Sequence, residues 1–277
     1  SVQSIHQDVL ENINRTDISF NKHIELSKFL KNKHGFSTYV ECIAGLPGMT
    51  PEKWYNEINV YTAYDMEICY YEWHLLPETP SYDHNFRKRM GIDTVNKSLR
   101  VNNKIPHKTE IVVESFSYSK EEYKEMWMAY TIQRTFWATG FLEKTLSTIL
   151  KKSNIGYGDF VKKFHNEFLR KDAVSGPILT KYINTVDLTF DQYYKPQSEV
   201  NELSIEFPHI TAPLTSSLML TFYYNMDQCK DYIKQWLLKE FPYLNPKSVD
   251  REINDLITRN NKFKKKFNGI RYINYNN

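Results

Sequence analysis

The sequence predicts an α/β fold followed by a mostly helical region, and three segments support this prediction. "STYVECIAG" (37–45) is an apolar run rich in β-formers, with the length of a buried strand. "GLPGMTPEKW" (45–54) supplies the glycines of a sharp turn and then Thr50 and Pro51 as the start of a helix. "EICYYEWHLL" (67–76) reads as a second strand. Strand, helix and strand in this order predict a βαβ unit with parallel strands.

The first 90 residues hold the α/β elements. Residues 1–4 are expected to end a strand, and helices are expected over 6–15 and 19–34. Gly35 follows lysines in the last turn of the second helix and is a stop signal. The helix that begins at Pro51 is expected to run to about Tyr64.

The pattern changes after the second strand. Residues 85–108 are polar and irregular, and "TEIVVESFSYS" (109–119) is a further strand. Ser119 and Glu122 form a capping box before a long helix with a break at Gly140. More helices are expected over 157–171, 216–241 and 246–263. The predicted parts are 1–90, a connecting segment with a strand at 91–118, and a helical domain at 119–277.

Composition narrows the classes of function. With 41% hydrophobic residues and no apolar run near the ~20 residues of a membrane helix, the chain is predicted to be globular, with no membrane partner. A net charge of +3 is too small to argue for nucleic acid. The basic, aromatic stretch "KFKKKFNGIRYINYNN" at 262–277 is the one candidate for RNA binding, and a solvated helix end is the preferred interpretation.

The three cysteines, Cys42, Cys69 and Cys229, are too far apart in sequence to form a zinc or iron–sulfur motif. Low cysteine use and the lack of a signal peptide favour the cytoplasm. The chain begins with Ser1 inside an expected strand and has no initiator methionine, which indicates a fragment or a processed chain.

Three segments together resemble the second half of the radical S-adenosylmethionine (SAM) barrel, in the branch that often carries an N-terminal cobalamin domain. They are "SVQS" at 1–4, "VLENINR" at 9–15 and "ECIAGLPGMT" at 41–50, in the order in which that family has them. The resemblance implies the C-terminal part of a partial (β/α)6 barrel, followed by the helical domain.

The resemblance also implies roles for single residues, with SAM lying across the carboxyl ends of the strands. Gln3, with Ser4 beside it, would reach the sugar or amino-acid part of SAM. Arg15 would pair with its carboxylate, which suits a guanidinium. Glu41 would accept hydrogen bonds from the ribose hydroxyls.

The remaining implied contacts are to adenine. Ile43 and Gly45 match strand positions that pack against it or pass close to it, where glycine avoids a collision. Leu75 and Leu76, in "WHLLPETP", match the adenine-side backbone position more loosely.

The family binds a [4Fe–4S] cluster through CxxxCxxC, and this chain lacks that motif. The chain is therefore expected to supply the distal wall of the SAM site and a substrate or interaction domain, and to be inactive alone. Its partner would be the missing N-terminal part of the protein. The parent reaction would use a 5′-deoxyadenosyl radical, or cobalamin for methyl transfer. The whole enzyme would therefore be an oxidoreductase or a transferase. The sequence does not indicate its substrate.

Two other functions remain open at this stage. In the first, the chain is a non-catalytic interaction module. In the second, it is a (β/α) enzyme that holds a phosphate at the "GLPG" turn and the following helix. His74, with Glu72 and Tyr70 along one strand face, is a further acid–base candidate, for which a structural role is the preferred interpretation.

Overall fold

A computed structural model describes residues 3–16, 19–36, 38–101, 105–195, 204–207 and 210–267. The chain forms two compact units, which are described separately. Unit 1 comprises Ser1–Tyr130, Gly156–Lys162 and Phe190–Leu203. Unit 2 comprises Thr131–Ile155, Lys163–Thr189 and Ser204–Asn277.

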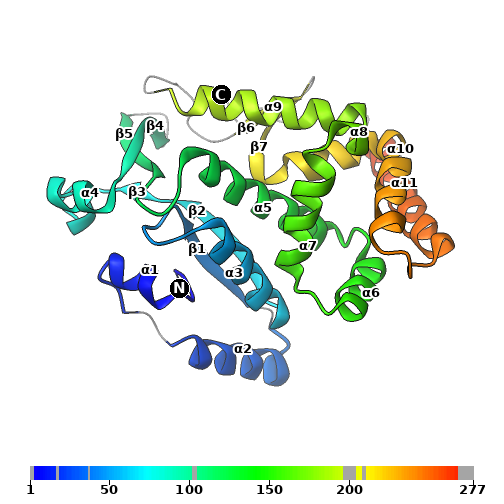
Figure 1. Cartoon of the computed structure of the whole chain (residues 1–277), viewed down its shortest axis with the longest axis horizontal. Coiled ribbons are helices and arrows are strands. Elements are labelled where there is room, and N and C mark those ends of the chain that lie inside the picture. The colour runs from blue at the N-terminus through cyan, green and yellow to red at the C-terminus, as the bar shows by residue number, and fades with distance from the viewer. Residues whose placement is uncertain are drawn as a thin grey trace. The chain divides into compact units, whose positions relative to one another are not determined.

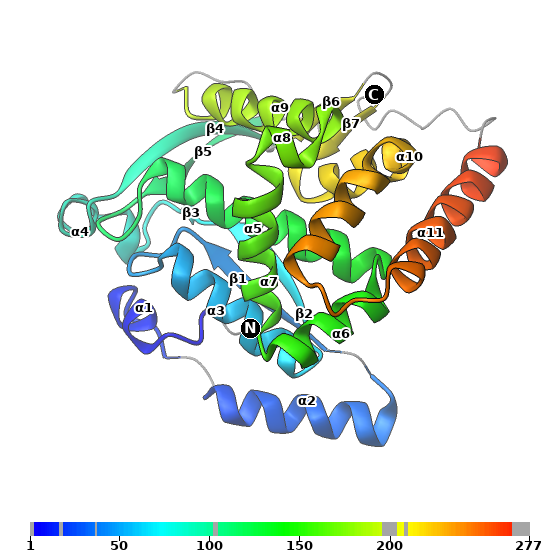
Figure 2. The same ribbon diagram turned by 45° about the vertical axis from the view of Figure 1, so that its right-hand side comes forward.

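The predicted βαβ unit is present in unit 1. Strands β1 (Tyr39–Ala44) and β2 (Glu67–Glu72) pair in parallel and are joined through α3 (Pro51–Ala63). Thr50 caps α3 by accepting a hydrogen bond from the backbone N–H of Lys53, with Pro51 at the first helical position. Figures 1 and 2 show α3 lying against the two strands.

The two faces of this sheet differ in burial. One face packs on helices: the Trp54 ring of α3 stacks on Tyr70 at 3.9 Å, and Tyr70 meets Tyr130 edge-on at 4.4 Å. The other, which we call the open face, carries Tyr39, Glu41, Ile43, Cys69 and Tyr71. On it Tyr39 is 58% exposed and Tyr71 54%.

Two helices precede the sheet, as predicted. They are α1 (Gln7–Asn12) and α2 (Phe20–His34). Gly35 ends α2 in the left-handed conformation, with φ of +68°. Gln3 and Ser4 are not in a strand, so the expected strand at 1–4 is not found in its described part, while residues 1 and 2 lie outside the described residues.

The predicted strand over 67–76 is wrong in its extent. It ends at Glu72, and His74–Leu75 forms β3 in a different, antiparallel sheet of order β3-β5-β4. The strand predicted at 109–119 is β5 (Ile105–Glu114), which begins earlier and ends at Glu114, and β4 (Asp93–Val101) pairs with it.

Residues 85–108, predicted as irregular, contain regular structure. They include most of helix α4 (His84–Met90), the whole of β4 and the start of β5, and the 3₁₀ turn η1 (Pro80–Tyr82) precedes them. Asp83 caps α4 by accepting from two backbone N–H groups, and Gly91 ends it with φ of +59°. These start and stop signals are present in "DHNFRKRMG" and were missed.

Helix α5 (Lys120–Thr139) begins at the predicted capping box, where Ser119 and Glu122 exchange hydrogen bonds. It ends before Gly140, whose φ is +60°. The following helices are α6 (Glu143–Ser153), α7 (Tyr157–Lys163), the π-helical η2 (Phe164–Leu169), α8 (Asp172–Ser175) and α9 (Pro177–Tyr193).

Unit 2 is mainly helical. A short hairpin of β6 (Ser204–Phe207) and β7 (Ile210–Pro213) leads into α10 (Leu214–Glu240), which has a kink at Asn225. α11 (Pro246–Phe267) lies beside α10 (Figures 1 and 2). Asn245 caps it by accepting hydrogen bonds from the Lys247 and Ser248 N–H groups.

The structure therefore has mixed α/β and helical parts, as the sequence predicts, and shows no closed or partial barrel among the described residues. The same residues include no helix with both the length and the apolarity that crossing a bilayer requires. The three-part division at residues 90 and 118 stays a prediction.

Candidate functional site

Unit 1 contains a pocket of about 620 Å³ at the carboxyl end of β1. Its walls come from the end of α1, the turn after β1, the link between β2 and β3, and the η1–α4 segment. They are lined by Gln3, Glu11, Asn12, Ile13, Asn14, Arg15, Ile43, Leu46, Trp73, Pro80, Ser81, Phe86, Arg89 and Met90.

Three of the predicted site residues meet in this pocket: Gln3, Arg15 and Ile43. Gln3 is buried, and Ile43 faces the pocket from the open face of the sheet. The chain reaches Arg15 after Asn14 turns in the left-handed conformation (φ +50°) and the Arg15 N–H donates to the Leu10 carbonyl at 2.9 Å. Residues that are distant in sequence are thus brought to one cavity.

The other predicted residues do not line the pocket. Glu41 shares the open face with Ile43 and accepts a hydrogen bond from the Tyr71 hydroxyl at 3.5 Å. Leu75 is buried, whereas Leu76 is 57% exposed. Ser4 points elsewhere, since its hydroxyl donates to Glu57 at 2.5 Å.

The chain itself gives one reason for a glycine at position 45. Its φ is +89°, and a Cβ atom there would lie 3.0 Å from the Tyr118 hydroxyl and 3.3 Å from the Val112 carbonyl oxygen. The close approach is therefore to the chain's own β5 and α5 region, while the contact with adenine stays a prediction.

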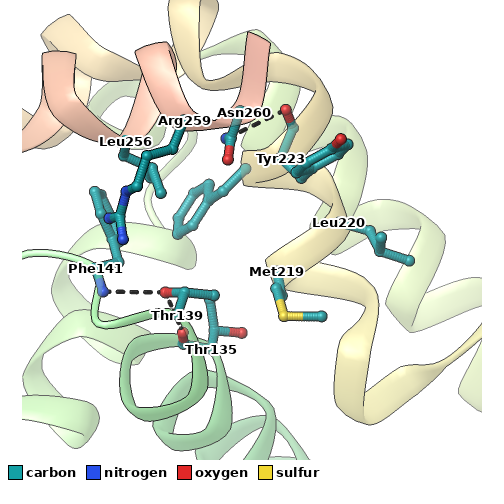
Figure 3. Close-up of a pocket in the computed structure, with 10 residues that line it drawn as sticks. Thr135, Thr139, Phe141, Met219, Leu220, Tyr223, Leu256, Arg259 and Asn260 are labelled. Atoms are coloured by element: carbon teal, nitrogen blue, oxygen red, sulfur yellow. Dashed lines mark hydrogen bonds between the residues drawn. The ribbon is translucent and has the colours of Figure 1, made fainter. Parts of the chain in front are cut away.

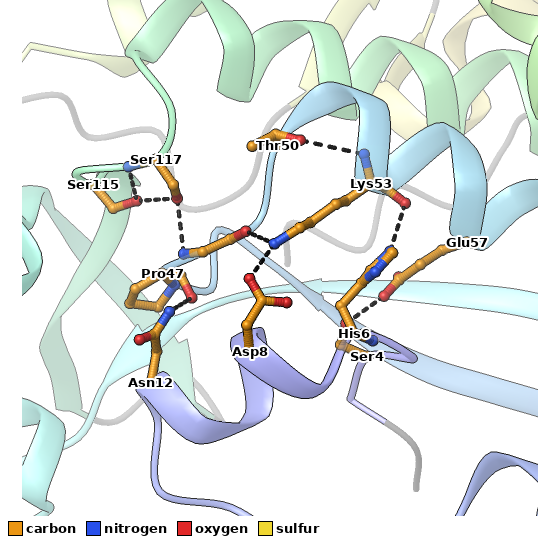
Figure 4. Close-up of polar contacts among 11 residues, drawn as sticks. Ser4, His6, Asp8, Asn12, Pro47, Thr50, Lys53, Glu57, Ser115 and Ser117 are labelled. Atoms are coloured by element: carbon orange, nitrogen blue, oxygen red, sulfur yellow. Dashed lines mark hydrogen bonds and ion pairs between the residues drawn. The ribbon is translucent and has the colours of Figure 1, made fainter.

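The turn after β1 is fixed by hydrogen bonds from three directions (Figure 4). The Pro47 carbonyl accepts from Asn12 at 3.0 Å, and the Gly48 carbonyl accepts from the Lys53 ammonium at 2.7 Å. The Gly48 N–H donates to Ser117 at 2.8 Å. The Lys53 ammonium also pairs with Asp8 of α1.

These contacts weaken the phosphate interpretation of the turn. A phosphate cradle needs backbone N–H groups that point at the ligand. Here the Gly48 N–H is used by Ser117 and the Met49 N–H by the Leu46 carbonyl, and Leu46 and Met49 are buried. The turn therefore acts as a structural joint, which holds together the elements that hydrogen-bond to it.

Glu57 of α3 anchors the segment that carries Gln3. Its carboxylate accepts hydrogen bonds from the Ser4 hydroxyl and from the Ile5 N–H at 3.1 Å (Figure 4). The side chain is fully buried, and this burial raises its pKa to about 7 against the smaller, opposing effects of both hydrogen bonds and Lys53.

His74 and Glu72 lie near one another, although the strand that was expected to carry both is broken. The His74 Nε2 atom is 3.9 Å from a Glu72 carboxylate oxygen, and Nδ1 is 3.3 Å from the Thr109 hydroxyl. Glu72 also accepts from the Tyr193 hydroxyl. Burial lowers the pKa of His74.

Lys97 extends this polar cluster. Only 1% of the residue is exposed, and its ammonium donates to the Tyr193 carbonyl at 2.6 Å. Burial lowers its pKa to about 8, opposed by the charge of Glu72. The cluster includes none of the residues that line the pocket, and this supports the structural interpretation of His74.

Sequence reasoning missed Trp73, Arg89 and Met90 because it assigned no helix at α4 and no strand break at Trp73. Among the described residues, no group of three or more histidine, cysteine or acidic side chains is arranged to hold a metal ion. Of the basic stretch at 262–277, residues 262–267 form the end of α11 and residues 268–277 lie outside the described residues.

No protein-family model matches the chain, and a search of curated proteins finds no similar sequence.

Gly45→Ala is expected to destabilise the protein more than Gly35→Ala. Both glycines have positive φ, but a Cβ at Gly35 meets nothing within 4 Å. Gly35→Ala should cost about 1 kcal/mol of strain, and Gly45→Ala roughly 2–4 kcal/mol because overpacking is added. Urea unfolding measures both, and equal losses would contradict the crowding at Gly45.

Glu57→Gln is expected to remove part of the pH dependence of stability. Because the folded pKa of about 7 exceeds the ordinary glutamate pKa of 4.5, the folded state holds the proton more tightly, and its stability falls as pH rises between these values. The loss attributable to Glu57 is at most about 3 kcal/mol.

Urea unfolding of wild type and Glu57→Gln at pH 5 and pH 8 measures this difference. Glu52→Gln, at an exposed position of α3, is the matched control. A pH dependence unchanged in Glu57→Gln would show that Glu57 does not titrate in this range.

Proposed function

We propose that this chain is the C-terminal portion of a radical SAM enzyme and that the pocket of unit 1 binds SAM. The observation that carries the proposal is the convergence of Gln3, Arg15 and Ile43 on one cavity. The family resemblance assigns each of these residues to SAM, and nothing in their local sequence requires them to meet.

The pocket has the size and the groups that SAM needs. Its volume of about 620 Å³ falls within the ~300–1,000 Å³ that is usual for small-molecule sites. Ile43, Leu46 and Trp73 offer an apolar and aromatic wall to adenine. Arg15 and Arg89 would serve the carboxylate of the methionine part.

The remaining polar groups suit a zwitterion. Glu11, on the same wall as Arg15, would accept a hydrogen bond from the SAM amino group, and the Gln3 amide would bind a sugar or amino-acid oxygen. Glu41 lies two residues before Ile43 on the open face, where the resemblance places the ribose.

SAM bound beside a [4Fe–4S] cluster supplies radical chemistry after one-electron reduction, and cobalamin in some members of the branch carries methyl groups. In our proposal, the residues of this chain bind and orient SAM and exclude water. Cluster ligands, and cobalamin where it is used, would come from another part of the same protein.

The exposure of the open face of the β1–β2 sheet supports the proposal that another part of the same protein packs against unit 1. Parallel sheets are almost always covered on both faces and contain several strands. Here, in the described part of the chain, two parallel strands leave one face with two tyrosines more than half exposed. The preceding strands of the barrel would pair with β1 and cover this face, while unit 2 would serve a substrate or another protein.

Arg15→Ala is expected to weaken SAM binding by roughly 10- to 100-fold, the equivalent of the ~1.5–3 kcal/mol of a charge-assisted hydrogen bond. Calorimetric titration of the full-length protein, reconstituted with its cluster, measures this loss. The absorption spectrum of the cluster should not change.

Arg251 is an exposed arginine of α11, so Arg251→Ala is the matched control and should bind SAM as wild type does. Equal affinity of Arg15→Ala and wild type would refute the site. The coding sequence upstream of Ser1 provides a second test: we expect CxxxCxxC there, and an initiator methionine within a few codons would remove the catalytic part of the proposal.

A further inference from the structure

Unit 2 contains a second pocket, of about 230 Å³, enclosed by the end of α5, the first half of α10 and α11 (Figure 3). Half of the ten side chains that line it are apolar. They are Phe141, Met219, Leu220, Phe222 and Leu256. The kink of α10 at Asn225 follows directly after this wall.

The uncharged polar groups of the pocket are engaged by the chain itself. The Thr135 and Thr139 hydroxyls each donate to a backbone carbonyl four residues earlier, both at 2.7 Å. Asn260 donates to the Tyr223 carbonyl at 3.4 Å (Figure 3). These bonds occupy the two threonine hydroxyls and one N–H of Asn260 without a ligand.

Arg259 differs from these groups. It is exposed, and in Figure 3 its side chain extends from α11 toward Phe141 and Thr139. No acidic residue lines the pocket, and within the described part of the chain none forms an ion pair with Arg259. A cation therefore lies beside an apolar cavity, and no described acidic residue pairs with it.

The size of the cavity limits the apolar part of a ligand. An apolar cavity of ~150 Å³ in another protein stays dry and binds benzene. The present pocket is larger and has room for a ring and a short polar group. A guanidinium at its edge selects a carboxylate as that group, since the two form paired, charge-assisted hydrogen bonds.

We propose that this pocket binds a monocarboxylate whose hydrocarbon part is about the size of a phenyl ring, with the carboxylate on Arg259 and the ring among Phe141, Met219 and Phe222. This site is separate from the proposed SAM site and does not depend on it. The carboxylate belongs either to a free small acid or to the end of a peptide.

Calorimetric titration of the whole chain with 3-phenylpropionate tests the proposal, with 3-phenyl-1-propanol as the uncharged analogue and acetate as the anion without a ring. We expect wild type to bind 3-phenylpropionate at least tenfold more tightly than either of the others. A peptide ending in phenylalanine, with and without a C-terminal amide, distinguishes the two sources of the carboxylate.

Two variants locate the ligand. Arg259→Met, at an exposed position, should lose tenfold or more in affinity for 3-phenylpropionate, while Arg251→Met on the same helix should not. Met219→Phe fills the cavity and should abolish binding. Neither variant should affect SAM binding, and Arg15→Ala should not affect 3-phenylpropionate.

Three results would overturn the proposal. The first is no binding of 3-phenylpropionate to wild type at about 10 mM, well above the millimolar Kd of a weak ligand. The second is equal affinity for the acid and the alcohol. The third is wild-type affinity in Arg259→Met.

Discussion

The hydrogen-bonded turn between β1 and α3 is the constraint on which unit 1 depends. Its carbonyls accept from Tyr118 at Gly45, from Asn12 at Pro47 and from Lys53 at Gly48. These donors come from the segment before α5, from α1 and from α3. Because buried backbone groups must find partners, each bond fixes one element against the end of β1. The position of the pocket walls follows from this joint, since Ile43 and Leu46 flank it.

A second constraint acts on the N-terminal segment. A buried carboxylate is costly unless hydrogen bonds satisfy it, and in the described structure only Oε1 of Glu57 is satisfied, by Ser4 and Ile5, while the buried Oε2 has no hydrogen-bond partner. The raised pKa indicates that burial outweighs these bonds. Glu57 therefore fixes the start of the segment while Asn12 fixes its end, and the pocket residues Gln3 and Arg15 lie at or near these two points.

The elements that the sequence predicts are those with local signals. Thr50 accepts a hydrogen bond from the Lys53 N–H, and Ser119 accepts one from the Glu122 N–H, each within one helical turn, so short motifs identify these helix starts. The β3-β5-β4 sheet has no such signal, because β3 meets β5 only across more than 30 residues, as in the pair His74 and Ile111. The residues of the site divide in a related way. Family spacing pointed to Gln3, Arg15 and Ile43, whereas Trp73 depends on a strand break without a local signal. Arg89 depends on α4, whose capping aspartate and terminal glycine are present in the sequence but were not recognised.

The two pockets share one physical feature but differ in the ligands that they would select. Each sets arginine beside apolar side chains, which favours anions with a hydrophobic part. The pocket of unit 1 adds Glu11 and Gln3, so a plain carboxylate there would meet a like charge, whereas a zwitterion would find a partner for each of its charges. The pocket of unit 2 has no acidic residue in its wall, so a positively charged ammonium there would lose hydration without compensation. Selectivity between an amino acid derivative and a simple acid therefore depends on a single carboxylate.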